Sequence, residues 1–262
     1  IGIFTLIWGL SNVSNGMYGI ISLITGIFVL VLFGIIELRS EFPLLDVRAL
    51  KSNRVLIFSS LAAYINYSST FAISYMMSMY LQYIKGIEPQ YTGMILLIQP
   101  AMQAIFSPIA GVLSDKMDPQ YVASAGMALI TISLFLLSLL GINTQIYLMI
   151  MLLGVLGVGF ALFSSPNTNS VMSSIERKDY GVAAGILSTA RTVGQSFSMA
   201  MTALITSFYL GNQTITAETS GLFIQSFKTI FIIFAILCLF GIWASLARGK
   251  RAEKDQPTAG TP

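Results

Sequence analysis

The chain has 262 residues, of which 55% are hydrophobic and 10% are charged, and its net charge is +3. It contains no histidine and one cysteine, Cys238, so a Ser/His/Asp triad, most zinc sites and a disulfide framework within the chain are excluded. The phosphate-binding pattern G-x-x-x-x-G-K-[ST] does not occur, which argues against an ATP-driven motor. The hydrophobic segments contain no nucleophile paired with a base and no metal-binding cluster, so we expect neither an enzyme nor a cofactor.

Apolar runs long enough to cross a membrane follow one another along the chain, which predicts an all-α, polytopic transmembrane helix bundle. A spanning helix needs about 20 predominantly apolar residues. The opening run, Ile1 to Leu10, is too short and begins without Met, so we interpret it as the end of a helix that starts upstream. Seven further runs follow, at Ile20 to Ile36, Val55 to Ile84, Tyr91 to Leu113, Tyr121 to Leu140, Gln145 to Phe163, Gly181 to Leu210 and Ile224 to Leu246.

The distribution of basic residues predicts how these helices are oriented. Short cytoplasmic loops keep an excess of Lys and Arg. Eleven of the fourteen basic residues lie in alternate gaps between the predicted helices, namely in 38–54, at Lys116, at Arg177 and Lys178, and in the tail after Leu246. We therefore expect a multi-pass protein of the cell membrane with a cytoplasmic C-terminus. The positive charge then reflects topology and not a nucleic-acid-binding surface.

The hydrophobic pattern divides the chain into four parts. One partial and one full extra helix occupy 1–37, and a basic cytoplasmic linker with the run PLLDVRALKSNR occupies 38–54. A block of six helices occupies 55–246, and a polar cytoplasmic tail that we expect to be disordered occupies 247–262. Many transporters consist of two repeated bundles with the substrate site between them. The block is therefore predicted to be one half of a two-domain transporter.

Four local sequences carry a resemblance to a known family. They are SYMMSMYLQYIKG at 74–86, SPIAGVLSDK at 107–116, SSPNTNSVMSS at 164–174 and GVAAGILSTARTVGQS at 181–196. Together they resemble the C-terminal half of a major facilitator superfamily transporter. More narrowly, they resemble the fourteen-spanner drug:proton antiporters, whose linker before the seventh core helix is similar to PLLDVRALKSNR. The resemblance implies a multidrug efflux protein in which two extra helices separate two six-helix halves.

One motif of the family is only partly matched. Gly111, Leu113, Asp115 and Lys116 fit the G-x-L-x-D-[KR] pattern of the cytoplasmic gating loop, but the glycine and basic pair that usually follow are replaced by the run DPQ at 118–120. The stronger copy of this motif, the antiporter's proline-glycine motif and the membrane carboxylate of proton coupling would lie in an N-terminal half outside this chain. The implied partners are that missing half, a small-molecule substrate, protons and the lipid bilayer.

Arg191 is the most informative residue, because it lies in the otherwise uncharged segment Gly181 to Leu210. A guanidinium at membrane depth is costly and usually faces a partner, a water-filled cavity or a substrate path. All eleven acidic residues lie in loops or at helix ends, so Arg191 is predicted to pair with carbonyls, amides, water, the missing half or a ligand. A structural role, in which Arg191 pins helix ends, is the alternative. The predicted polar face of its helix contains Ser188, Arg191, Thr192, Gln195, Met199 and Thr202.

Uncharged polar residues on the first two core helices are further candidates for the substrate cavity. Gln99 and Gln103 lie one helical turn apart, and a stripe on the first core helix contains Tyr67, Thr70, Ser74 and Ser78. Such groups can hydrogen-bond a substrate, but they also join helices to one another within membranes. Both roles stay open at this point.

Candidates for a cytoplasmic gate lie at the predicted cytoplasmic ends of the helices. Gly111, Asp115 and Lys116 belong to the partly matched loop motif, and the last two are expected to bond across the interface between the halves. Asn167 and Asn169 follow Pro166, where their amides can contact the gating surface or satisfy backbone groups that the proline frees. The second role is favoured for each asparagine. No residue is predicted to bind a metal.

The sequence therefore predicts a secondary active transporter that exports drugs or other amphipathic compounds by alternating access, in exchange for protons. An arginine in the cavity does not itself favour cations. A superfamily transporter of another small solute, including an anion attracted by Arg191, is therefore the close alternative. A nontransporting membrane scaffold or sensor is a further alternative, and it would not need the polar face around Arg191.

Overall fold

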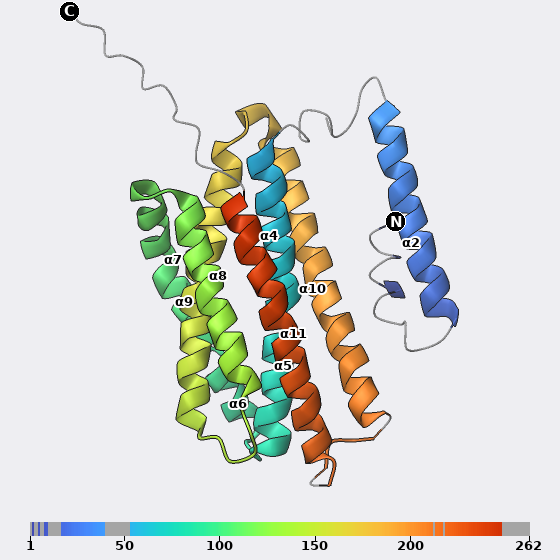
Figure 1. Ribbon diagram of the computed structural model, residues 1–262, viewed down its shortest axis with the longest axis vertical. Coiled ribbons are helices and arrows are strands. Elements are labelled where there is room, and N and C mark those ends of the chain that lie inside the picture. Colours follow the sequence, from blue (N-terminus) through green and yellow to red (C-terminus); the bar gives the residue numbers. More distant parts are fainter. Residues whose placement is uncertain are drawn as a thin grey trace, which may run out of the picture.

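The computed structural model describes residues 17–39, 53–211, 213–216 and 218–247, together with residues 2, 5, 8 and 9. All regular elements in these residues are helices, which confirms the predicted all-α fold. Helix α2 (Met17–Arg39) precedes the main bundle in the chain, and Figure 1 shows it apart from the bundle, beyond α10.

The described residues from 53 to 247 form a bundle of six long rods (Figure 1). Two of the rods are composite, because short helices follow one another almost without interruption. In chain order the elements are α4 (Arg54–Thr70), α5 (Ala72–Met79) and the π-helix η2 (Tyr80–Ile84); α6 (Pro89–Leu96) and α7 (Ile98–Lys116); α8 (Pro119–Ser138); α9 (Ile146–Ser173); the 3-10 helix η3 (Arg177–Asp179) and α10 (Tyr180–Leu210); and α11 (Ser220–Ala247).

Five rods in the described residues are long and apolar enough to cross a membrane. They run over Arg54–Ile84, Pro89–Lys116, Pro119–Ser138, Ile146–Ser173 and Ser220–Ala247. The rod α10 has 31 residues but is not among these five, since small and polar residues accompany Arg191 along it. The predicted helix at Gly181 to Leu210 is thus present.

Pairwise packing sets the order of the rods. Helix α8 packs between α9 and α11, α4 packs between α10 and α11, and α7 packs on the outer side of α9. Four phenylalanines of α11 lie in the common core with Tyr80 and Met127, and all of them are almost fully buried. The composite rod α6–α7 is the least buried of the five apolar rods, so most of its surface faces away from the bundle.

Glycines allow several of these rods to approach closely. A Cβ added at Gly126 of α8 would lie 2.7 Å from the carbonyl oxygen of Gly159 on α9, so any side chain there would push the two helices apart. Gly194 of α10 packs in the same way against the backbone of α4 at Tyr64. Gly211 ends α10 with a φ of 59°, a conformation that a residue with a side chain rarely adopts.

The structure differs from the sequence prediction at one helix end. The fourth core helix was expected to end at Phe163, but α9 continues to Ser173 with Pro166 inside it. A hydropathy analysis does not detect this last part of the helix, because many of its residues are polar. The Thr168 hydroxyl donates to the carbonyl oxygen of Ser164, and Asn167 bonds the neighbouring helix, so polar side chains support the helix beyond the proline.

Several predicted segments lie outside the described residues. The structure describes little of the partial helix at 1–10 and only residue 247 of the tail. Of the basic linker it describes residues 38 and 39, which end α2, and residues 53 and 54. Arg54 is the first residue of α4, where Asn53 accepts a hydrogen bond from the backbone N–H of Leu56. The boundaries of the four predicted parts stay predictions.

Candidate functional site

A cavity of about 390 Å³ lies between rods at mid-length of the bundle. It brings together candidates from two separate sequence segments, the stripe on α4–α5 and the pair of glutamines on α7. Helices α9 and α10 complete its wall. Its lining consists of Tyr67, Thr70, Phe71, Ser74, Tyr75, Gln99, Gln103, Phe160 and Met199.

The α4–α5 rod is interrupted at the cavity wall. Helix α4 ends at Thr70 and α5 begins at Ala72, so Phe71 lies between them. The Ser198 hydroxyl on α10 accepts a hydrogen bond of 3.1 Å from the backbone N–H of Ala72, and Thr70 Oγ1 donates to the carbonyl oxygen of Asn66 over 2.6 Å. Interhelical and back-bonded hydroxyls therefore bond backbone groups of the rod at the point where α4 gives way to α5.

Gln99 and Gln103 are placed by a close contact between α7 and α9. A Cβ at Gly157 of α9 would lie 2.7 Å from Cβ of Met102 and 3.2 Å from the backbone nitrogen of Gln103. Both glutamines are half-buried, and neither side-chain amide makes a hydrogen bond to another described residue. Their amide groups are thus available on the cavity side.

Arg191 meets the cavity lining at Tyr67. The guanidinium carbon lies 5.7 Å from the centroid of the Tyr67 ring, within the range of a cation–π interaction. Nη2 donates a 2.7 Å hydrogen bond to the Thr168 hydroxyl on α9. Nε is buried and has no hydrogen-bond partner among the described residues. Arg191 thus connects α10 with α9 and α4, and part of its donor capacity is unused.

The predicted polar face of α10 does not form one continuous surface. Ser188 and Thr192 are exposed, Gln195 is half-buried, Met199 lines the cavity and Thr202 is buried. Helix α10 packs along α4, and the face changes from exposed at Ser188 and Thr192 to buried at Thr202. The residues predicted to act together thus lie in three different environments.

The gate candidates lie at the end of the bundle where α7 and α9 end and α4 and α10 begin. Asp115 and Lys116 are exposed in the last turn of α7. Gly111 lies one turn earlier, where an added Cβ would be 3.7 Å from the hydroxyl of Ser165 on α9. The three residues therefore share one helix end, but only Gly111 faces another helix closely.

The two asparagines near Pro166 differ in their surroundings. Asn167 is buried, and its Nδ2 donates a 3.1 Å hydrogen bond to the backbone carbonyl of Ser59 on α4. Asn169 is half-buried. Asn167 therefore joins α9 to α4, whereas Asn169 is the more accessible of the pair.

Sequence reasoning missed Thr168, the partner of Arg191, and several members of the cavity. Thr168 was not a candidate, although it is polar, directly follows Asn167 and lies near a helix end, and these features could have pointed to it. Phe71, Tyr75 and Phe160 line the cavity but carry no signal that separates them from ordinary core or lipid-facing aromatics. Their position depends on how distant helices pack.

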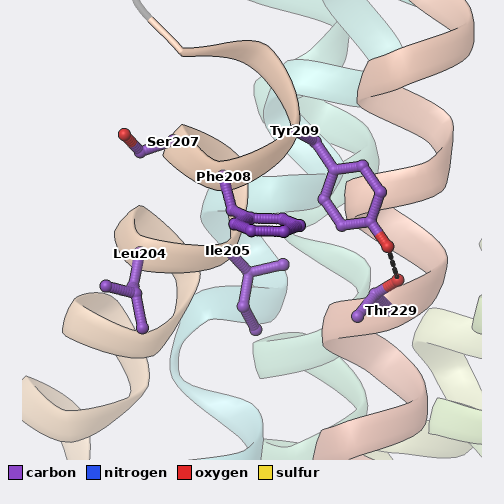
Figure 2. Close-up of a pocket in the computed structure, with 6 residues that line it drawn as sticks. All are labelled: Leu204, Ile205, Ser207, Phe208, Tyr209 and Thr229. Carbon is purple, nitrogen blue, oxygen red and sulfur yellow. Dashed lines mark hydrogen bonds between the residues drawn. The ribbon is translucent and has the colours of Figure 1, made fainter.

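A second concavity, of about 470 Å³, lies on the outside of α10 near its C-terminal end, next to α11. Figure 2 shows Tyr209 reaching toward Thr229 of α11, and their hydroxyls are 2.9 Å apart. Phe208 on its rim is 86% exposed. The other residues that line it are Leu204, Ile205 and Ser207. Acyl chains would cover such an apolar surface, so it does not indicate a substrate site.

These features are those of a multi-pass membrane protein, with apolar helices around a partly polar cavity at mid-length. The sequence profile of the Major Facilitator Superfamily matches residues 59–262. The chain therefore belongs to the Major Facilitator Superfamily.

Curated relatives are transporters and resistance proteins. The riboflavin transporter RibZ of Clostridioides difficile is 28% identical over 236 residues, which cover 88% of this chain and 51% of RibZ. The methyl viologen resistance protein SmvA of Salmonella typhimurium is 26% identical, over 71% of this chain and 37% of its own length. The lincomycin resistance protein LmrB of Bacillus subtilis is 25% identical, over 77% of this chain and 43% of its own length. The chain thus spans about half the length of these relatives or less.

A solved structure has the same fold. A bacterial homolog of the human lysosomal transporter Spinster, in an inward-facing and occupied conformation, aligns with a TM-score of 0.63 and 11% identity. The alignment covers 88% of this chain and 57% of that protein. At this identity the likeness supports the transporter fold and not a shared substrate.

Proposed function

We propose that this chain forms the C-terminal half of a secondary active transporter, which exports drugs or other amphipathic compounds by alternating access in exchange for protons. The observation that carries the proposal is the cavity itself. Polar residues predicted from separate segments, Tyr67 and Ser74 on one rod and Gln99 and Gln103 on another, converge on one space at mid-length of apolar helices. Polar groups at such a depth are expected where a solute passes.

The shape of the bundle supports a pathway shared with a second half. The α6–α7 rod carries Gln99 and Gln103, yet most of its surface is exposed. Transporters of this kind place the substrate between two bundles, and the chain spans about half the length of its curated relatives. We infer that the second half covers the open side of the cavity. In this arrangement the helix ends with Asp115 and Lys116 are cytoplasmic and belong to a gate.

The export of drugs is supported by two relatives, a methyl viologen resistance protein and a lincomycin resistance protein. A riboflavin transporter favours the second candidate, a superfamily transporter of another small solute. A nontransporting scaffold or sensor is the least supported alternative, because neither the cavity nor the guanidinium of Arg191 would be needed.

Transport is tested with the complete transporter in proteoliposomes that carry an imposed pH gradient. Uptake of a fluorescent amphipathic dye should depend on the gradient and should be accompanied by proton release. Replacement of both cavity glutamines, Gln99→Leu with Gln103→Leu, should reduce the flux, whereas Gln225→Leu, an exposed glutamine on α11, should not. A rate of dye uptake that does not change with the pH gradient would contradict proton coupling. The absence of uptake of any amphipathic dye would contradict export.

A further inference from the structure

We propose, on the basis of the transport function above, that this chain's part of the cavity binds aromatic compounds that carry a carboxylate or carbonyl acceptor group. Arg191 supplies the positive charge for that group. The relatives leave the charge of the substrate open, since the compounds in their names, riboflavin, methyl viologen and lincomycin, differ in kind.

The charge around the cavity is the first support. None of the residues that line it is acidic or basic. The acidic residues described from Asn53 onward all lie at helix ends or in loops, at Glu88, Asp115, Asp118, Glu176, Asp179 and Glu218. A cationic compound therefore finds no counter-charge at cavity depth in the described residues, and Arg191 repels it. A group that is negative or rich in acceptor atoms is instead attracted by Arg191, and no acidic residue at cavity depth in the described residues repels it.

The hydrogen-bonding groups of the wall are the second support. Each glutamine amide offers two N–H donors, and neither Gln99 nor Gln103 uses them within the described residues. The hydroxyls of Tyr67 and Ser74 can also donate to a ligand. Thr70 is the exception, because its hydroxyl hydrogen is directed at the carbonyl oxygen of Asn66. The cavity is thus able to satisfy several acceptor atoms at once.

Arg191 is placed to extend this set of donors. A guanidinium has five N–H donors, and the described hydrogen bonds use one of them, from Nη2 to Thr168. Nε is buried without a partner, which is costly for a charged group. Met199, which lines the cavity, lies two turns further along the same face of α10, about 12 Å away at 1.5 Å per residue. Tyr67 spans part of this separation, since its ring contacts the guanidinium and also lines the cavity.

The rest of the wall suits a flat aromatic body. Phe71, Tyr75 and Phe160 offer ring surfaces, and Met199 offers a deformable thioether. The substrate class is therefore an aromatic compound with an acceptor group at the end that faces Arg191.

Two xanthene dyes of opposite charge test this inference: anionic fluorescein and cationic pyronin Y. Their dissociation constants for the complete transporter in nanodiscs are measured by fluorescence anisotropy at neutral pH. Arg191→Gln should weaken fluorescein binding by about tenfold, because a charge-assisted hydrogen bond is lost. Pyronin Y binding should stay unchanged or become tighter. Arg191→Lys, which keeps the charge, should retain part of the preference. Arg177→Gln, at an exposed position of η3, removes the same charge outside the cavity and should change neither constant.

The decisive quantity is the ratio of the two dissociation constants, because a general loss of folding would weaken both dyes alike. A ratio that Arg191→Gln leaves unchanged would overturn the proposal, and so would a wild-type transporter that does not bind fluorescein. Transport is measured separately, in proteoliposomes with a pH gradient. Fluorescein binding that depends on Arg191 without dye movement would contradict the transport function and leave the recognition chemistry standing. Transport of pyronin Y together with a ratio that Arg191→Gln leaves unchanged would support the transport function and contradict the proposed recognition chemistry.

Discussion

Arg191 on α10 and Thr168 on α9 are joined by a 2.7 Å hydrogen bond from guanidinium Nη2 to the threonine hydroxyl. The same hydroxyl donates to the carbonyl oxygen of Ser164, so the arginine is fixed to the helix that carries Pro166. A cation at membrane depth is thereby held in a defined place beside Tyr67 without a carboxylate partner in the described residues.

Thr168→Val is expected to lower the free energy of unfolding by about 1–2 kcal/mol, because the guanidinium loses its interhelical acceptor. Thr168→Ser should restore most of the loss, since it keeps the hydroxyl. The measurement is thermal unfolding of the complete transporter in detergent. Thr192→Val is the control, because that exposed hydroxyl bonds only to the carbonyl oxygen of Ser188 on its own helix. Equal effects of the two valine substitutions would show that the Arg191 contact contributes nothing.

Gly157→Ala is expected to push α7 away from α9 and to displace both cavity glutamines. The new Cβ would meet Met102 Cβ at 2.7 Å, so the free energy of unfolding should fall by about 1–3 kcal/mol, and flux should fall with it. Gly154→Ala is the matched control on the same helix, because its Cβ would meet only ordinary contacts at 4.0 Å. Similar losses in the two variants would contradict the close packing at Gly157.

Two buried asparagines allow the same substitution to be compared with and without a hydrogen bond. Asn167→Ala removes the bond to the Ser59 carbonyl and should lower the free energy of unfolding by about 1–3 kcal/mol. Asn66 is 0% exposed, and neither atom of its amide has a hydrogen-bond partner among the described residues. Asn66→Ala should therefore cost clearly less in a thermal unfolding measurement. If Asn66→Ala costs more than Asn167→Ala, the Asn66 amide has a partner such as a buried water.

Asp115→Asn is expected to slow transport without lowering the unfolding temperature. Asp115 is exposed at the end of α7 and has no described ion pair, so its charge is free to act on the proposed second half of the transporter. Glu176→Gln is the control, since it removes an acid whose only described salt bridge is an exposed one to Lys178. The initial rate of dye flux in proteoliposomes decides the matter, and an unchanged rate in Asp115→Asn would remove that residue from the proposed gate.

Hydropathy alone predicted the all-α architecture, because runs such as Ile224 to Leu246 have no other stable form in a bilayer. It did not predict where α9 ends. The polar stretch from Ser164 to Ser173 is helical. Thr168 supports it through the Ser164 carbonyl of the same helix, and Asn167 supports it through the Ser59 carbonyl of α4, a contact that depends on a neighbouring helix. The break at Phe71 escaped prediction for a similar reason, since the Ser198 hydroxyl on another helix accepts from the N–H of Ala72.

Helical spacing predicted part of the cavity. Gln99 and Gln103 had to share a face, and so did Tyr67, Thr70 and Ser74, and the structure brings these two faces together. The face around Arg191 was predicted as one unit and is divided, because Thr202 is buried while Ser188 stays exposed. Spacing within one helix does not show which neighbour covers it. The roles of these residues in transport stay proposals.

Accessibility of the cavity from the two sides of the membrane tests the central claim of alternating access most directly. Single cysteines at Ser74 and Gln103 in the complete transporter, with other reactive cysteines removed, are labelled from each side by an impermeant maleimide. Native Cys238, which is 0% exposed, should stay unlabelled and serve as the internal control. Alternating access predicts that both positions react from one side at a time, and that the reactive side changes when the pH gradient is reversed. Labelling from the same side under both gradients, or from neither side, would contradict the claim that this cavity lies on a transport path.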